Sequence, residues 1–141
     1  MSDAPVPRAA PLTVERLTVR ADRLVCEVAV APTAPRSTSP ELLARVCAAR
    51  PHLPLHACVN EEGDTFAAVM DHTSLPHLLE HLVIDMQAQA VSDANAVFVG
   101  TTEWIDEFAG RARIEVSFTD DLVALRAFRD AIAFLNNTVV L

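Results

Sequence analysis

Two runs rich in β-branched residues stand close together near the start of the sequence, and they restrict the fold more than any other feature. They occupy residues 12–19 (LTVERLTV) and 24–30 (LVCEVAV), with Ala21 and Asp22 between them. β-Branched residues favour extended backbone, and strands joined by so short a connection pair antiparallel. The sequence therefore predicts a β-hairpin over residues 12–30.

A first helix is expected after the Pro- and Ser-rich segment that follows the hairpin. Ser39 is a good N-cap, and Pro40 suits the first helical position. Pro51 marks the end of this helix. Its apolar stripe consists of Leu42, Leu43 and Val46. The short apolar run at residues 53–59 then predicts a brief strand.

The second half of the chain alternates helices and strands. A long helix is predicted at about residues 74–91, followed by strands at residues 95–102 and 112–119 that the segment EWIDEFAGR connects. A last helix, capped by Thr119 or Asp120, ends at an Asn-Asn pair. The order β-β-α-(β)-α-β-β-α predicts a two-layer α+β fold, with helices packed on a mainly antiparallel sheet.

The length of 141 residues fits one domain. Residues 1–10 are rich in Ala and Pro and are expected to be a disordered lead-in. Residues 11–141 are expected to form the single domain.

The composition narrows the classes of partner. The formal net charge is −8, which disfavours nucleic acid and anionic membrane surfaces, because both attract basic patches. No apolar run approaches the roughly 18 residues of a membrane span, and the start lacks the apolar core of a secretory signal. Cys26, Cys47 and Cys58 are odd in number and lack C-x-x-C spacing, as is typical of reduced thiols. The sequence thus predicts a cytoplasmic protein.

The segment TSLPHLLEHLVIDMQ places His77, Glu80 and His81 in an H-x-x-E-H pattern on the long helix. Two histidines four residues apart project from one helix face and are able to bind one Zn²⁺. A carboxylate offset from both is placed to act as general base on the water that zinc acidifies. This is the inverted form of H-E-x-x-H, found in inverzincin peptidases. The alternative is a solvated polar helix face without a metal.

A zinc site needs a third protein ligand, and spacing alone does not choose it. The candidates are His52, His56, Cys58, His72, Asp71 and Glu103. His56 and Cys58 alternate in an extended run, so they point to one side together. The competing interpretation of His56 is a partly buried histidine at a strand end. Asp85 lies one turn after His81 and is a candidate to hold its free ring nitrogen.

These residues resemble the N-terminal domain of cyanophycin synthetase, where a helix reads H-x-x-E-H-x-A-L-E-L-Q. The matching positions are His77, Glu80, His81 and Gln87, with Asp85 where the pattern has Glu. The family also carries an H-x-C segment upstream, which His56-Ala57-Cys58 matches, and a later helix similar to VALRAFRDAIAFLNN. The resemblance covers residues 53–137.

The resemblance implies specific roles. In the synthetases this domain holds the growing Asp-Arg polymer, and in some members it bears a zinc metallopeptidase site that trims polymer into primers. Carried over, the zinc ligands are His56, His77 and His81, with Glu80 as the base. Cys58 then supports the ligands or packs beside them. The strand before the last helix reads RIEVSFTDD, whereas the family is more aromatic and acidic there.

Three functions follow from these observations. The leading hypothesis is a zinc-dependent hydrolase that cleaves a peptide or amide bond in a small, Arg-containing substrate. The second is a non-catalytic module that holds a peptide or polymer in the same groove. The third is a structural subunit whose apolar surface mediates homo-oligomerisation. A hydrolase should lose turnover and keep its metal when Glu80 becomes Gln, whereas a binding module should keep its ligand affinity.

Overall fold

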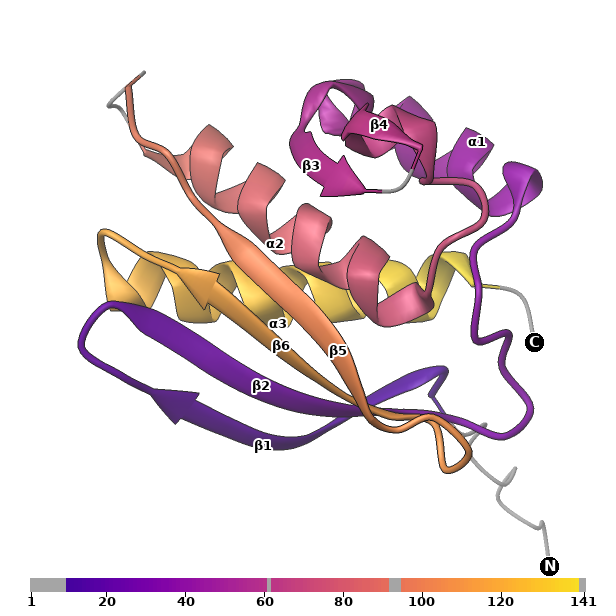
Figure 1. The fold of residues 1–141 in the computed structure, drawn as a ribbon. Helices are drawn as coiled ribbons and strands as arrows, with labels where there is room; N and C mark the ends of the chain where they lie inside the picture. Colours follow the sequence, from indigo (N-terminus) through magenta and orange to yellow (C-terminus); the bar gives the residue numbers. More distant parts are fainter. Residues whose placement is uncertain (1–9, 61, 92–94, 140–141) are drawn as a thin grey trace, which may run out of the picture.

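The computed structural model describes residues 10–60, 62–91 and 95–139. An antiparallel sheet of order β1-β2-β6-β5 is covered on one face by two long helices, α2 (Leu75–Ala90) and α3 (Asp121–Thr138), as Figure 1 shows. The strands are β1 (Leu12–Val19), β2 (Arg23–Val30), β5 (Gly100–Asp106) and β6 (Arg111–Ser117). The predicted two-layer α+β class is confirmed. Most of the predicted lead-in, residues 1–9, lies outside the described residues.

The core forms where the central strands send every second side chain toward the helices. In β2 and β6 buried and partly exposed residues alternate, as expected of a sheet with one covered face. The buried positions of these two strands are Leu24, Cys26, Val28, Val30, Ala112, Ile114 and Val116. β1 and β2 pair antiparallel from Leu12↔Val30 to Val19↔Leu24, so the predicted hairpin is confirmed.

Between β2 and α2 the chain makes an excursion that packs on the side of α2 away from the sheet (Figure 1). It contains the helix α1 (Pro40–Ala49), the strand pair β3 (Ala57–Asn60) and β4 (Gly63–Thr65), and two short 3-10 helices, Leu53–Leu55 and Phe66–Ala68. The oxygen of Ser39 accepts from Leu42 N, as its predicted N-cap role requires. The excursion and the sheet together enclose α2 on several sides.

Two of the predicted strands are placed differently by the structure. The apolar run at residues 53–59 begins as a 3-10 helix, and only Ala57–Asn60 is a strand. Residues 95–99 are not a strand; β5 starts at Gly100 and continues through Asp106, where a connection was expected. β5 extends to Asp106 because this segment pairs with β6. Thr102, Glu103 and Trp104 lie opposite Ile114, Arg113 and Ala112. β4 was not predicted at all.

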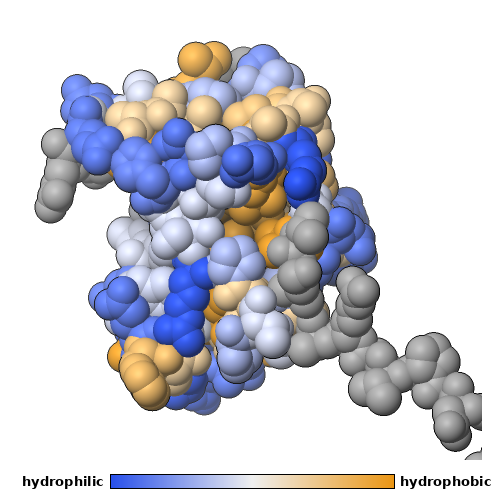
Figure 2. Space-filling model, turned by 90° about the vertical axis from the view of Figure 1, so that its right-hand side faces the viewer, coloured by the Kyte–Doolittle hydropathy of each residue, from blue (hydrophilic) through white to orange (hydrophobic). Residues whose placement is uncertain are grey.

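The surface agrees with the acidic, polar composition. On the side shown in Figure 2, hydrophilic side chains cover most of the molecule and apolar ones appear in separate patches, one of them within a recess. In the part of the chain that the structure describes, no helix has both the length and the apolar character needed to cross a membrane.

Candidate metal centre

The long helix α2 buries polar side chains among its leucines, which is the first sign of a site. Glu80, His81, Asp85 and Gln87 are each at most 4% exposed. Burying such groups is costly unless they have hydrogen-bond partners. Among the described residues, no buried side-chain nitrogen or oxygen lacks such a partner. Gln87 donates through Nε2 to the carbonyl of Ser117 on β6, so this member of the motif ties the helix to the sheet.

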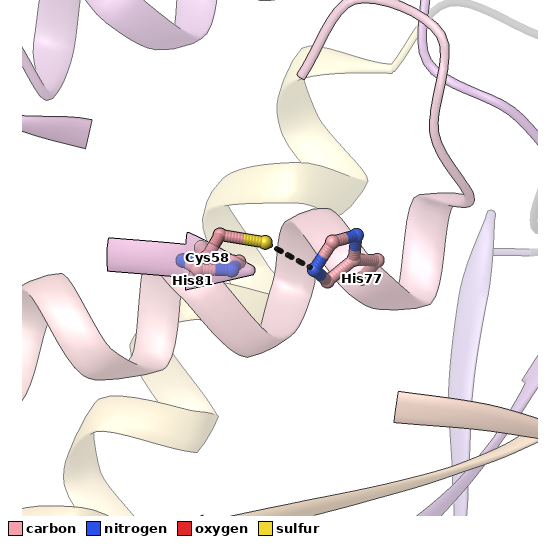
Figure 3. Close-up of side chains that lie close together, drawn as sticks. All are labelled: Cys58, His77 and His81. Carbon is pink, nitrogen blue, oxygen red and sulfur yellow. Dashed lines mark hydrogen bonds between the residues drawn. The ribbon is translucent and has the colours of Figure 1, made fainter. Parts of the chain in front are cut away.

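Cys58, His77 and His81 come together above α2. Each offers one ligand atom, and these three atoms lie within 4.8 Å of one another. Figure 3 shows Cys58 on β3 and the two histidines on α2, with Cys58 Sγ directed toward His77 Nε2 at 3.6 Å. The helical spacing of four residues aligns the two imidazoles, and the excursion brings the thiol to them.

Neighbouring side chains hold both imidazoles in place. His77 Nδ1 lies 2.8 Å from Thr73 Oγ1, and donation by Nδ1–H leaves the Nε2 lone pair facing Cys58. Phe66, fully buried in the second 3-10 helix, stacks on His81 with ring centroids 4.0 Å apart. The same ring meets His77 edge-on at 5.2 Å. This arrangement, with the far ring nitrogen held by an outer partner, is typical of metal-binding histidines.

His56 joins the cluster from the other side of His81. Its Nδ1 lies 3.1 Å from His81 Nδ1, and its Nε2 lies 3.3 Å from Asp85 Oδ1. The second oxygen of Asp85 accepts from Arg50 NH1 at 3.4 Å. Asp85 was one candidate to hold the free ring nitrogen of His81; its carboxylate instead contacts His56 and Arg50, so its influence reaches His81 through His56. Arg50, Asp85 and His56 thus form a relay, a chain of side-chain contacts that ends at His81.

Glu80 faces the sheet side of the same site. Its Oε1 accepts from Thr102 Oγ1 of β5 at 2.8 Å, and its Oε2 lies 3.5 Å from His81 Nε2. Glu80 lines a cavity of about 650 Å³ together with Cys58, His77 and His81. Residues 97–102, which form the start of β5 and the segment before it, also line this cavity. The side chains of Cys58, His77 and His81, which could ligate a metal, and the carboxylate of Glu80 therefore line one cavity.

Burial sets the protonation of these groups. Burial, followed by the charges of His77 and His56, lowers the pKa of His81 to about 3, and burial also lowers the pKa of His77. Both imidazoles are therefore neutral near pH 7, the form that binds metals. Burial raises the pKa of Glu80 to about 7, against the hydrogen bond from Thr102 and the charge of His56.

Asp85 is the one buried carboxylate of the site whose pKa is lowered. Burial alone would raise the pKa of Asp85, but the hydrogen bond and charge of His56, together with Arg50, outweigh it. Asp85 is therefore an anion near pH 7, and it holds His56 by a charge-assisted hydrogen bond.

The donor set fits zinc. Thiolate and imidazole are preferred zinc ligands, and Zn–S and Zn–N bonds of about 2.3 and 2.0–2.1 Å at tetrahedral angles place S and N about 3.6 Å apart. The Cys58 Sγ to His77 Nε2 distance has this value. The cluster offers three protein ligands, the number typical of catalytic zinc sites, which keep a fourth position open.

A scan against protein-family models matches residues 23–140 to the cyanophycin synthase-like N-terminal domain. The chain belongs to this family. The family match covers every element from β2 to α3, including the excursion and the residues Cys58, His77 and His81, whereas β1 precedes it. Comparisons with curated proteins and with solved structures gave no match. The family resemblance expected from the H-x-C and H-x-x-E-H segments is thus confirmed.

Other candidate ligands lie away from the cluster. His52 is exposed before the first 3-10 helix, and His72 contacts Asp71 and Glu62 on the surface. Glu103 contacts Arg113 at 3.0 Å on the sheet face opposite the helices. The segment EWIDEFAGR, expected to be a connection, is thus partly a strand.

Several residues that build the site were not foreseen from the sequence. Phe66 and Thr73 orient the histidines, and Thr102 and Gly100 surround Glu80. Only Gly100 carries a local signal. It is one of three glycines in the chain and lies in a β-rich run, where glycine often marks a close approach of another group.

Gly100→Ala is expected to destabilise the protein by about 1–3 kcal/mol, the usual cost of overpacking. A Cβ at this position would lie 2.8 Å from Glu80 Cγ and 3.0 Å from the carbonyl of Glu115, so helix and strand would have to move apart. Urea denaturation measures the change. Gly63→Ala is the control, because among the described residues its Cβ would come close only to the Ala68 methyl, at 3.2 Å. Equal losses for both variants would contradict the close packing of Glu80 on β5.

Proposed function

We propose that this chain is a zinc-dependent hydrolase of peptide or amide bonds. The observation that supports this most is the convergence of Cys58, His77, His81 and Glu80 on one cavity. A zinc ion held there would supply Lewis acidity, which polarises a substrate carbonyl and makes water acidic at neutral pH. We assign Cys58 as the third ligand, since its Sγ and one ring nitrogen each of His77 and His81 lie within 4.8 Å of one another.

Glu80 is the proposed general base and acid. Thr102 donates to Oε1, so the proton is carried at Oε2, the oxygen beside His81. In the reaction Glu80 accepts a proton from the attacking water at this oxygen and returns it to the departing amine. Thr73 and Phe66 hold the imidazoles, and the relay from Arg50 through Asp85 to His56 holds His81 from behind.

Family membership favours a second candidate, a non-catalytic module that holds an Asp-Arg polymer or another peptide in the same cavity. In this case the histidine cluster is structural, and the protein binds its ligand without a metal. The two candidates differ in metal content, so metal analysis is the first experiment.

Protein purified without chelator is expected to contain about one zinc per chain, measured by elemental mass spectrometry. Cys58→Ser and His77→Ala should weaken zinc affinity at least a hundredfold in competition with a chelating dye, because each removes a ligand. His56→Gln should weaken it roughly tenfold, as the loss of an outer partner does.

Cys47→Ser is the matched control, because this half-buried thiol lies on α1 outside the cluster. A larger effect of His56→Gln than of Cys58→Ser would show that His56 is the third ligand, as the family resemblance implies. Protein that contains no zinc and takes up none on addition would rule out the metallohydrolase.

A further inference from the structure

β5 is an edge strand, and its free edge borders the candidate site. The sheet order β1-β2-β6-β5 leaves β5 with a strand partner on one side only, within the described residues. Gly100, Thr101 and Thr102 of β5 line the same cavity as His77, Glu80 and His81. In Figure 1 β3 lies above α2 and β5 below it, and all three elements contribute residues to the lining of this cavity.

The register shows which backbone groups of β5 face the free edge. Ser117 N donates to Val99 O, and Val99 N donates to Ser117 Oγ, so the backbone of Val99 faces β6. Backbone groups of successive strand residues point to alternate sides. Thr101, paired with Glu115, therefore also faces β6. The N–H and C=O groups of Gly100 and Thr102 point away from β6, toward the free edge.

The part of this edge beside the cavity lacks the protection that sheet edges usually carry. Natural proteins block free edges with charged residues or proline. Farther along, β5 carries Glu103 and Asp106, but the segment beside the cavity, residues 97–102, reads VFVGTT and has no charge and no proline. The side chains of Val97 and Val99 are 79% and 65% exposed. An uncharged, β-prone edge beside a polar cluster is suited to receive another strand.

We infer that the substrate is an extended peptide that adds to the free edge of β5. The N–H and C=O groups of Gly100 and Thr102 hydrogen-bond to alternate residues of the peptide, which places a peptide carbonyl above His77 and His81. Recognition is then through the backbone, and side chains contribute where they meet the cavity walls. This inference rests on the proposed zinc site.

The test uses zinc-loaded protein and hydroxamates, which bind zinc whatever is attached to them. Isothermal titration calorimetry compares acetohydroxamate with two peptide series, Ac-Thr-Val-Thr-Val-NHOH and hydroxamoylacetyl-Thr-Val-Thr-Val-NH2, which extend to opposite sides of the metal. Each peptide is also made with a single N-methyl group at each amide in turn. N-methylation removes one backbone donor and leaves the side chains unchanged.

One series is expected to bind roughly tenfold more tightly than acetohydroxamate, because it gains several backbone hydrogen bonds. Within that series, N-methylation at alternate amides should remove most of this gain, and N-methylation at the amides between them should cost less than about twofold. Binding of acetohydroxamate without any gain from either peptide, or equal effects of all N-methylations, would overturn the edge-strand inference alone. Failure of acetohydroxamate itself to bind would overturn the zinc site and this inference with it.

Discussion

Glu80→Gln is expected to lower turnover by roughly 10²–10⁴-fold, the usual contribution of a general base, and to leave zinc content unchanged. Glutamine has the same shape, and its carbonyl oxygen still accepts from Thr102 Oγ1. What it loses is the ability to take up a proton at the second position, beside His81. Turnover is measured by the hydrolysis of a quenched fluorescent peptide library with one fixed arginine and of soluble Asp-Arg polymer.

Glu103→Gln is the matched control for this prediction. Glu103 lies on the same strand as Thr102, but its carboxylate contacts Arg113 on the opposite face of the sheet. This variant should keep full turnover. A Glu80→Gln protein that retains more than about a tenth of wild-type turnover would show that another group moves the proton, since a general base contributes at least about a hundredfold. Wild-type protein that binds the polymer without zinc and without turnover would support the binding module.

Local chemistry explains why the helices were predicted well. Ser39, Ser74 and Asp120 cap α1, α2 and α3 through side-chain hydrogen bonds to residues two or three positions later, so the signal lies within one turn. β5 was misplaced because strand limits depend on a partner far along the chain. Val97 and Val99 look like strand residues, but they precede the segment that pairs with β6.

Only the part of the candidate site that lies on the helix α2 was predictable from local spacing. Helical spacing places His77, Glu80 and His81 on adjoining positions, and a resemblance pointed to the His56-Ala57-Cys58 segment. The burial of Glu80 and Asp85 depends on Thr102 and Arg50, which are 22 and 35 residues away. Such partners leave no periodic pattern, so neither the burial nor the relay through His56 was visible in the sequence.

The stability of the metal-free protein is expected to depend on pH through two buried groups that act in opposite directions. The pKa of His81 falls from 6.5 to about 3 on folding, so the unfolded chain binds an extra proton below pH 6.5 and stability is lost as the pH falls toward 3. The pKa of Glu80 rises from 4.5 to about 7, so the folded chain holds an extra proton there. Its contribution to stability is full below pH 4.5 and is lost as the pH rises through 7.

Between pH 4.5 and 6.5 the two pH dependences of stability cancel, because folding releases one proton at His81 and takes up one at Glu80. Glu80→Gln removes this balance. Glutamine resembles the protonated carboxyl at every pH, so the metal-free variant should gain stability over the wild type as the pH rises from 4 to 8. The gain corresponds to the shift at Glu80 and is about 3 kcal/mol.

Urea denaturation of both metal-free proteins at pH 4, 5.5, 6.5 and 8 gives this difference. All other titrating groups are common to the two proteins, so the comparison isolates Glu80. Glu103→Gln, which changes an exposed carboxylate outside the site, is the control. A difference between Glu80→Gln and wild type that stays constant from pH 4 to 8 would mean that the pKa of Glu80 is the same in the folded and the unfolded chain. The inference that burial beside Thr102 keeps the Glu80 carboxyl protonated would then be wrong.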